Sequence, residues 1–502
     1  MKKIQFALIG MMCFAQAWAQ NATDVFRYSQ QFNLGTARSQ GVGGAFGAVG
    51  ADYSSTYLNP AGLGLYRRND FHLSAAITTN FASGRFLGAT ETDNRTNFNI
   101  PSFGLVLTKV NTGLTGDAKK GIVSYNFAFG HNRADNYQQN IFMQGRNSTN
   151  SITDFYIQQS DGIAFNDIDA PGREAEFSSL AWRAYLTDTA DNSTSYYSPW
   201  LFGDSVYSLL QSQKITRRGA KDEYNINAAI NIGDLVYLGA GLVFVNIRHQ
   251  FTHEFTESDP NKTVSNSLGS RYNSSSLTID NNTSGNGVLG RFGVIIRPFD
   301  YFRFGVSAQT RMRVDMTDDY SYRVTSDIAN FGRYDVSSPE LTSNYEVITP
   351  ARYMASASVI IPSVGFVSAD FEMVDYGSGR LTSENSFSEA NQIVRRTYGE
   401  AYVLRLGTEL KLDDNYRFRA GYSAQSNPYK NTPAGVNADD LTVQSFSAGL
   451  GYTQGKEYLD FAAVYTRFNQ FESPYTLSNG GQPIGNVKNT NLNFVITYGQ
   501  RF

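Results

Sequence analysis

The 502-residue chain has little cysteine, proline or tryptophan: one Cys, 13 Pro and 3 Trp. The single cysteine, Cys13, lies near the N-terminus. The rest of the chain therefore offers no thiol nucleophile, no cysteine-ligated zinc and no disulfide. Positive charge is not in excess either, since 42 Lys and Arg face 45 Asp and Glu and the formal net charge is −3. Without a basic surface for a phosphate backbone, nucleic acid is not expected as a partner.

Long hydrophobic runs are also missing beyond the N-terminus. The mean hydropathy is −0.34. The most continuously apolar run, 235–245, is much shorter than the roughly 20 residues that a helical membrane span needs. These observations exclude a polytopic helical membrane protein. What is abundant is Phe (35), Tyr (31) and Gly (45), a composition typical of alternating strands with aromatic girdles.

The first 19 residues have the pattern of an export signal. Two lysines, Lys2 and Lys3, precede an apolar stretch at 4–14, and Ala-Trp-Ala at 17–19 is a small-x-small cleavage site. We therefore interpret 1–19 as a signal peptide that is removed on export. The alternative is a short buried helix.

From Asp70 onward the dominant pattern is alternation with a period of two, which places one set of side chains on each face of a strand. Phe302, Phe304 and Val306, for example, alternate with smaller or polar residues. This pattern fits either a soluble sandwich or a membrane barrel. Fourteen segments show it: 70–80, 100–109, 121–131, 222–232, 235–248, 287–297, 301–311, 352–361, 365–375, 402–412, 416–425, 442–453, 457–467 and 490–502.

Two features favour the barrel. Many of these segments have about 10 to 12 residues, which at a tilt of about 40° spans roughly 28 Å, whereas sandwich strands average about five to six residues. The connections also alternate between short turns and long polar segments at 81–99, 132–221, 249–286, 312–351, 376–401, 426–441 and 468–489. We predict an all-β fold in which 69–502 form a 14-stranded antiparallel transmembrane β-barrel with long extracellular loops, chiefly 132–221 and 249–286.

Residues 20–68 precede the first strand and lack its alternation. A short helix is predicted over 23–31, followed by a glycine-rich run and an Asn-Pro-Ala-Gly turn. Small residues allow a backbone to pack closely against a barrel wall, so we expect this segment to be an N-terminal hatch that plugs the lumen. Its marker residues are Gly43, Gly44, Gly47, Asp52, Asn59, Pro60, Ala61 and Gly62.

The run 43–48, Asp52 and the turn at 59–63 resemble the hatch of the FadL family, the outer-membrane transporters of long-chain fatty acids and other hydrophobic compounds. The segments 291–307 and 404–422 are similar to paired strands of that family, and the chain looks most like its Bacteroidetes-type members. The resemblance implies passive lipid transport in the outer membrane of a Gram-negative bacterium. A hydrophobic small-molecule ligand would land among the extracellular loops, move to a deeper site, and leave past the hatch or sideways through the wall. We expect a monomer without a cofactor, whose other partners are outer-membrane lipid and the barrel-assembly machinery.

Inward-facing arginines are candidates for ligand binding, because a guanidinium offers a bidentate fork to a carboxylate. The residues in question are Arg303, Arg405 and Arg419. In the alternative that we favour, such arginines pair with Asp370, Glu372 and Glu409 and tie the hatch to the wall.

The longest loop contains an apolar stripe at helical spacing that includes Phe177, Leu180 and Tyr185, with Trp182 beside it. A helix with this stripe should cover something apolar. These four residues are therefore candidates for a ligand-capture groove, and simple packing on the barrel rim is the alternative.

No catalytic constellation is visible, so an enzyme is not expected. His249 and His253 stand four residues apart with no third ligand implied, and no metal site is predicted there. Two rival functions stay open. A structural or secretion-system barrel would use the same fold without transport, and an outer-membrane enzyme would need a nucleophile or carboxylate site that the sequence does not display.

Overall fold

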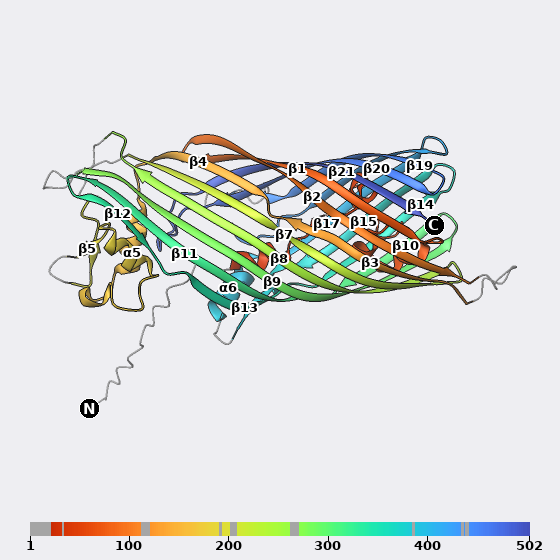
Figure 1. Ribbon diagram of the computed structural model, residues 1–502, viewed down its shortest axis with the longest axis horizontal. Helices are drawn as coiled ribbons and strands as arrows, with labels where there is room; N and C mark the ends of the chain where they lie inside the picture. The colour runs from red at the N-terminus through yellow and green to blue at the C-terminus, as the bar shows by residue number, and fades with distance from the viewer. Residues whose placement is uncertain are drawn as a thin grey trace, which may run out of the picture.

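The computed structural model describes residues 22–32, 35–111, 121–189, 193–200, 208–261, 271–383, 387–432, 436 and 441–502. The predicted signal peptide, 1–19, lies outside these residues. The strands form a closed, antiparallel barrel of fourteen staves, as the sequence predicts (Figure 1). No helix in the described ranges is long and apolar enough to cross a membrane.

Each stave of the barrel pairs with its neighbour in the chain, and the last closes on the first with Asp70 opposite Arg501. The staves are β1 (Asp70–Phe86), β2 (Ala89–Val110), β3 (Ile122–Asn136), β7 (Leu209–Ile232), β8 (Val236–Ser258), β9 (Arg271–Phe299), β10 (Phe302–Gln309), β14 (Arg352–Ile361), β15 (Gly365–Asp375), β17 (Glu400–Lys411), β18 (Tyr416–Gln425), β19 (Val443–Gln454), β20 (Glu457–Glu472) and β21 (Gly485–Arg501).

Several predicted loops are strands, which corrects the sequence-based boundaries. The segment 81–99 is a hairpin with a tight turn between β1 and β2, and 249–286 contains long extensions of β8 and β9. The segment 312–351 folds into β11 (Arg313–Ala329), β12 (Gly332–Ser337) and β13 (Leu341–Ile348). The outer part of β2 alternates only between exposed and half-buried side chains. Without an apolar face, the hydrophobic pattern that identifies a strand is absent.

The outer face of the staves carries an apolar band. On β8, Leu238, Leu242 and Phe244 point outward and are exposed, whereas Arg248 and Gln250 occupy the equivalent outward positions farther along. Such a band is what a transmembrane barrel presents to lipid. The part of β8 beyond about residue 245 therefore lies outside the membrane.

The N-terminal segment lies in the lumen. It comprises α1 (Ala22–Ser29), α2 (Ala37–Gly41), α3 (Ser55–Leu58) and the 3-10 helix η1 (Pro60–Leu65). The predicted helix over 23–31 corresponds to α1. Helix α2 packs against β18 to β21, and η1 packs against β3, β7, β8 and β9. The segment thus contacts opposite sides of the wall, and we refer to 22–66 as the hatch.

Figure 1 shows α5, β5 and β12 together at the end of the barrel that lies away from the C-terminus. The short elements between β3 and β7 are β4 (Gln139–Asn147), α4 (Ile152–Ser160), η2 (Phe165–Asp167), α5 (Phe177–Arg183), β5 (Asp188–Thr189) and β6 (Tyr196–Tyr197). After β15 the chain adds η4 (Tyr376–Ser378), β16 (Arg380–Thr382) and α6 (Ser388–Thr397). Helices α4 and α5 pack with β8, β9 and β11 in one hydrophobic cluster.

Candidate functional site

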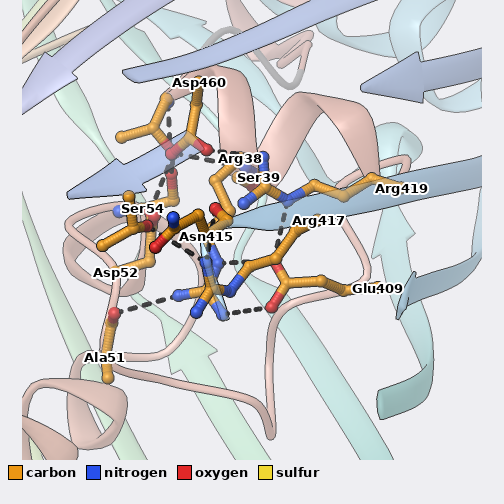
Figure 2. A network of polar contacts seen from close by, with 12 residues as sticks. Arg38, Ser39, Ala51, Asp52, Ser54, Glu409, Asn415, Arg417, Arg419 and Asp460 are labelled. Carbon is orange, nitrogen blue, oxygen red and sulfur yellow. Dashed lines mark hydrogen bonds and ion pairs between the residues drawn. The ribbon is translucent and has the colours of Figure 1, made fainter. Parts of the chain in front are cut away.

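A buried ion network joins the hatch to the wall (Figure 2). Arg38, on α2, donates from Nε and Nη2 to the Glu409 carboxylate of β17 at 2.9 and 3.0 Å. Arg419 of β18 donates to the same carboxylate at 2.7 Å and to Asp460 of β20 at 2.6 Å. Each guanidinium therefore has a carboxylate partner, as buried charges require.

The Asn-Pro-Ala turn forms a second attachment. Asn59 caps η1 by accepting a hydrogen bond from Ala61 N at 3.1 Å, and its Nδ2 donates to Gly47 O at 2.8 Å. The wall has glycine where the turn touches it. A Cβ on Gly293 would lie 1.8 Å from Asn59 Oδ1, and a Cβ on Gly239 would lie 2.2 Å from the Pro60 carbonyl carbon. Only a wall without side chains at these points admits the turn.

The glycine-rich run makes a third attachment. The backbone amides of Phe46 and Gly47 both donate to the Asp370 carboxylate of β15 at 3.0 Å. Gly43 has a positive φ of 66°, and a Cβ there would lie 2.8 Å from Tyr422 N on β18. Asp52 instead acts within the hatch, where it accepts a hydrogen bond from Thr36 Oγ1 at 2.8 Å. Gly44 also has a positive φ, and Gly62 packs against Ser55.

The three arginines that the sequence proposed as ligand contacts all have partners in the protein. Arg405 pairs with Glu372 at 2.5 Å. Arg419 belongs to the network of Arg38, and Arg303 donates to the carbonyl of Val49 in the hatch. The alternative interpretation favoured these carboxylate partners for Arg405 and Arg419, but the Arg405–Glu372 pair joins β17 to β15 within the wall, and Arg38 is what links Glu409 to the hatch. Asp370, the third carboxylate named there, binds hatch amides instead of an arginine.

A cavity of about 880 Å³ lies between the hatch and the outer elements. Its hatch side is formed by residues of α1 and the chain after it, including Phe26, Gln30 and Phe32. One wall is richer in apolar and aromatic side chains, and the facing wall is richer in amides and hydroxyls. The apolar wall, on β7, β8, β9 and β11, includes Ile215, Phe251, Ile279, Tyr320 and Tyr322 beside the polar Arg217, His249, His253 and Asn281. The polar wall, on β1, β19, β20 and β21, includes Thr78, Asn80, Ser445, Ser447, Thr466, Asn491 and Asn493 beside the apolar Val443, Val464, Phe468 and Phe471.

The wall has a seam beside this cavity. The hydrogen-bonded ladder between β2 and β3 ends at Ser102 opposite Asn132, next to Pro101, which has no N–H to donate. Beyond that point the outer part of β2 faces the end of β3 and β4 across side-chain contacts. They are Asn136 to Asn97 at 3.2 Å, Arg95 to Gln138 at 2.6 Å, and Gln144 to Glu91 at 2.8 Å.

The seam lies between the cavity and the apolar outer surface. Asn136 and Gln138 line the cavity on one side. On the other side Phe98 of β2 is 69% exposed on the outer face. A solute in the cavity is therefore separated from the lipid-facing surface by side chains rather than by a backbone ladder.

The loop helix predicted from the apolar stripe is α5. Phe177 and Leu180 are buried in the cluster of α4, α5 and the wall, with the Phe177 ring 4.6 Å from that of Tyr322. Trp182 packs edge-on against Phe165 at 5.7 Å. Tyr185 is 47% exposed. None of the four candidates is among the described residues that line the cavity, so their part in ligand capture stays a prediction.

His249 and His253 point into the lumen from the part of β8 that lies outside the membrane, and both line the cavity. Burial lowers the pKa of His253 to about 4, and the charge of Arg217 acts in the same direction. Burial, with Arg27 and Arg217, holds the pKa of His249 well below its usual range. Both rings are therefore neutral at ordinary pH. Within the described ranges no group of three His, Cys, Asp or Glu side chains could hold a metal ion.

No family model and no curated protein matches the chain. Solved structures do resemble it. A Pseudomonas aeruginosa FadL homologue is 13% identical with a TM-score of 0.55, and the match covers 94% of this chain and 100% of that one. The Pseudomonas putida toluene transporter TodX is 12% identical with a TM-score of 0.54, and the coverage is 94% and 99%. The Ralstonia pickettii toluene transporter TbuX is 16% identical with a TM-score of 0.51, and the coverage is again 94% and 99%.

The chain has the FadL-type fold. The motifs that carried the resemblance in the sequence, 43–48 and 59–63, are among the parts of the hatch that contact the wall. The cavity and the seam were not predicted, because their residues come from many separate strands. Pro101, inside an otherwise alternating segment, was the one local signal for the seam.

Proposed function

We propose that this FadL-type barrel is a passive transporter that carries hydrophobic or amphipathic small molecules across the outer membrane of a Gram-negative bacterium. The cavity is the observation that carries the proposal. Its volume of about 880 Å³ is within the size range of small-molecule sites, and its aromatic wall suits an apolar tail or ring. Long-chain fatty acids are one class of that size. The names of TodX and TbuX, toluene transporters of the same fold, support a hydrophobic cargo.

The geometry supports lateral exit better than passage through the hatch. Leaving through the hatch would break the buried ion pair of Arg38 with Glu409 and the hydrogen bonds that Phe46 and Gly47 donate to Asp370. Leaving through the seam breaks only side-chain hydrogen bonds, such as Asn136 to Asn97. Because a buried ion pair costs more to break than partly buried side-chain hydrogen bonds, we assign the exit to the seam.

The test is a reversible crosslink across the seam. Asn97→Cys and Asn136→Cys, bridged by a short bis-methanethiosulfonate reagent, should stop uptake, and a reductant should restore it. The matched control bridges Asn246→Cys and Asn286→Cys, which replace an Asn–Asn pair at 3.0 Å across the intact β8–β9 ladder. Uptake that continues through a fully bridged seam would refute lateral exit.

The rival function is a barrel that binds a protein partner and does not transport. The observation that favours this rival is a pair of exposed aromatic residues, Tyr185 after α5 and Phe331 between β11 and β12. A folded, inserted protein that supports no uptake of any hydrophobic probe would favour this rival.

A further inference from the structure

The positively charged side chains that line the cavity are matched within the protein. The described lining contains three arginines, and each has a carboxylate partner. Arg27 pairs with Asp24. Arg217 pairs with Glu472 at 2.8 Å, and Arg405 pairs with Glu372 at 2.5 Å.

A fatty-acid carboxylate would meet no available cation here. It would have to displace Asp24 from Arg27 or Glu472 from Arg217, which leaves an anion unpaired, or compete for Arg405 with Glu372, which Arg352 also holds. Such an anion is strongly disfavoured in a partly desolvated site. The two cavity histidines do not compensate, because both rings are neutral.

What the cavity does offer is uncharged hydrogen-bonding groups. In the part of the chain that the structure describes, Asn80 Oδ1, Asn281 Oδ1, His253 Nε2 and Tyr137 Oη are buried at the cavity and have no hydrogen-bond partner. Buried polar groups of this kind are normally satisfied. Their atoms are closed off from the cavity, so a head group reaches them only when the side chains turn toward it, and an uncharged head group then satisfies them without burying a charge.

The two walls give the ligand a direction. β1, β19, β20 and β21 supply most of the amides and hydroxyls of the two walls, while β7, β8, β9 and β11 are richer in apolar and aromatic side chains. The stave order places these two sets on opposite sides of the barrel. A molecule with one polar and one apolar side matches both walls at once.

We propose that the cavity selects uncharged amphipathic molecules, with an apolar tail and a hydroxyl-, ester- or amide-bearing head, over carboxylates with the same tail. This inference rests on the proposed transport function and names its substrate class.

The test compares three radiolabelled probes with one oleoyl tail: monoolein, methyl oleate and oleate. Each is titrated at pH 8 against the purified full-length barrel in amphipol. We expect monoolein to bind at least tenfold more tightly than oleate, with methyl oleate between them, because only monoolein offers hydroxyls and only oleate brings a charge.

A variant should largely remove the preference. Glu472→Gln removes the carboxylate that neutralises Arg217, so oleate should gain about tenfold in affinity while monoolein binds as before. The matched control is Glu254→Gln, which removes the partner of Lys214 at 3.6 Å on exposed parts of β7 and β8, away from the cavity. It should change neither affinity.

The wild-type comparison needs no variant and decides the matter if Glu472→Gln fails to fold. Oleate that binds the wild-type protein as tightly as monoolein, or a Glu472→Gln protein with an unchanged preference, would overturn the inference and leave the transport proposal standing. Binding of none of the three probes would overturn both.

Discussion

Replacing Asn59 with alanine should loosen the hatch. The change removes the acceptor for Ala61 N and the donor to Gly47 O, which lie at 3.1 and 2.8 Å in the buried turn. Leaving a buried donor or acceptor unpaired costs about 1–3 kcal/mol, so the docked conformation of the turn should be destabilised by roughly 2–6 kcal/mol. The same Nδ2 also loses its longer contacts with the wall carbonyls of Val294 and Val306, at 3.5 Å. Since about 1.4 kcal/mol is a tenfold change in an equilibrium constant, the displaced hatch should become at least tenfold more populated.

Limited trypsin digestion measures that population. Arg38 is held against Glu409 in the docked hatch, so cleavage after Arg38 reports displacement. We expect faster cleavage in Asn59→Ala than in wild type, and wild-type behaviour in Asn286→Ala, which removes an asparagine on the outer side of β9. Equal cleavage rates in all three proteins would refute the reasoning that the turn anchors the hatch.

Three further predictions concern the network, the outer loops and the seam. Glu409→Gln removes the negative charge that Arg38 and Arg419 share, so it should lower the free energy of unfolding in urea by about 2–4 kcal/mol. An unchanged midpoint of urea unfolding would contradict the stabilising role of the network. Glu257 lies outside the membrane, at the N-terminus of α4, and burial raises its pKa from 4.5 to about 7. The contribution of Glu257 to the stability of the fold is therefore complete below about pH 4.5 and is lost as the pH rises through 7. Hydrogen exchange in 152–160 should therefore speed up between pH 6 and pH 8.5 beyond the intrinsic rate change, and Glu257→Gln should abolish the excess. Pro101→Val restores a backbone donor beside Ser102, so it should extend the β2–β3 ladder and slow uptake several-fold; faster uptake would argue against the seam.

The sequence predicts the barrel well because lipid imposes alternation on each spanning stave. Predicted segments such as 365–375 and 416–425 coincide with β15 and β18. The prediction fails for 312–351, where β11 to β13 leave the membrane and lose an apolar outer face. The hatch turn was recognisable because its close approach to Gly239 and Gly293 restricts its residues.

The site itself was less predictable. Arg405 and Arg419 were correctly expected to have carboxylate partners, because buried guanidiniums must be paired. The cavity walls, in contrast, are formed by strands as distant in sequence as β1 and β20, and no local sequence pattern predicts that these strands line the same cavity. His249 and His253 attracted attention only as metal ligands, while the fold makes them neutral parts of a cavity wall.

Uptake by transporter-deficient Gram-negative cells that express the barrel tests the central claim most directly. The lipopolysaccharide layer of such cells slows spontaneous entrance of oleoyl probes, so a protein route is visible. The account predicts saturable uptake of radiolabelled monoolein that stops when the Asn97–Asn136 seam is bridged and resumes on reduction. Uptake no faster than in cells without the barrel, with the protein folded and inserted, would contradict it.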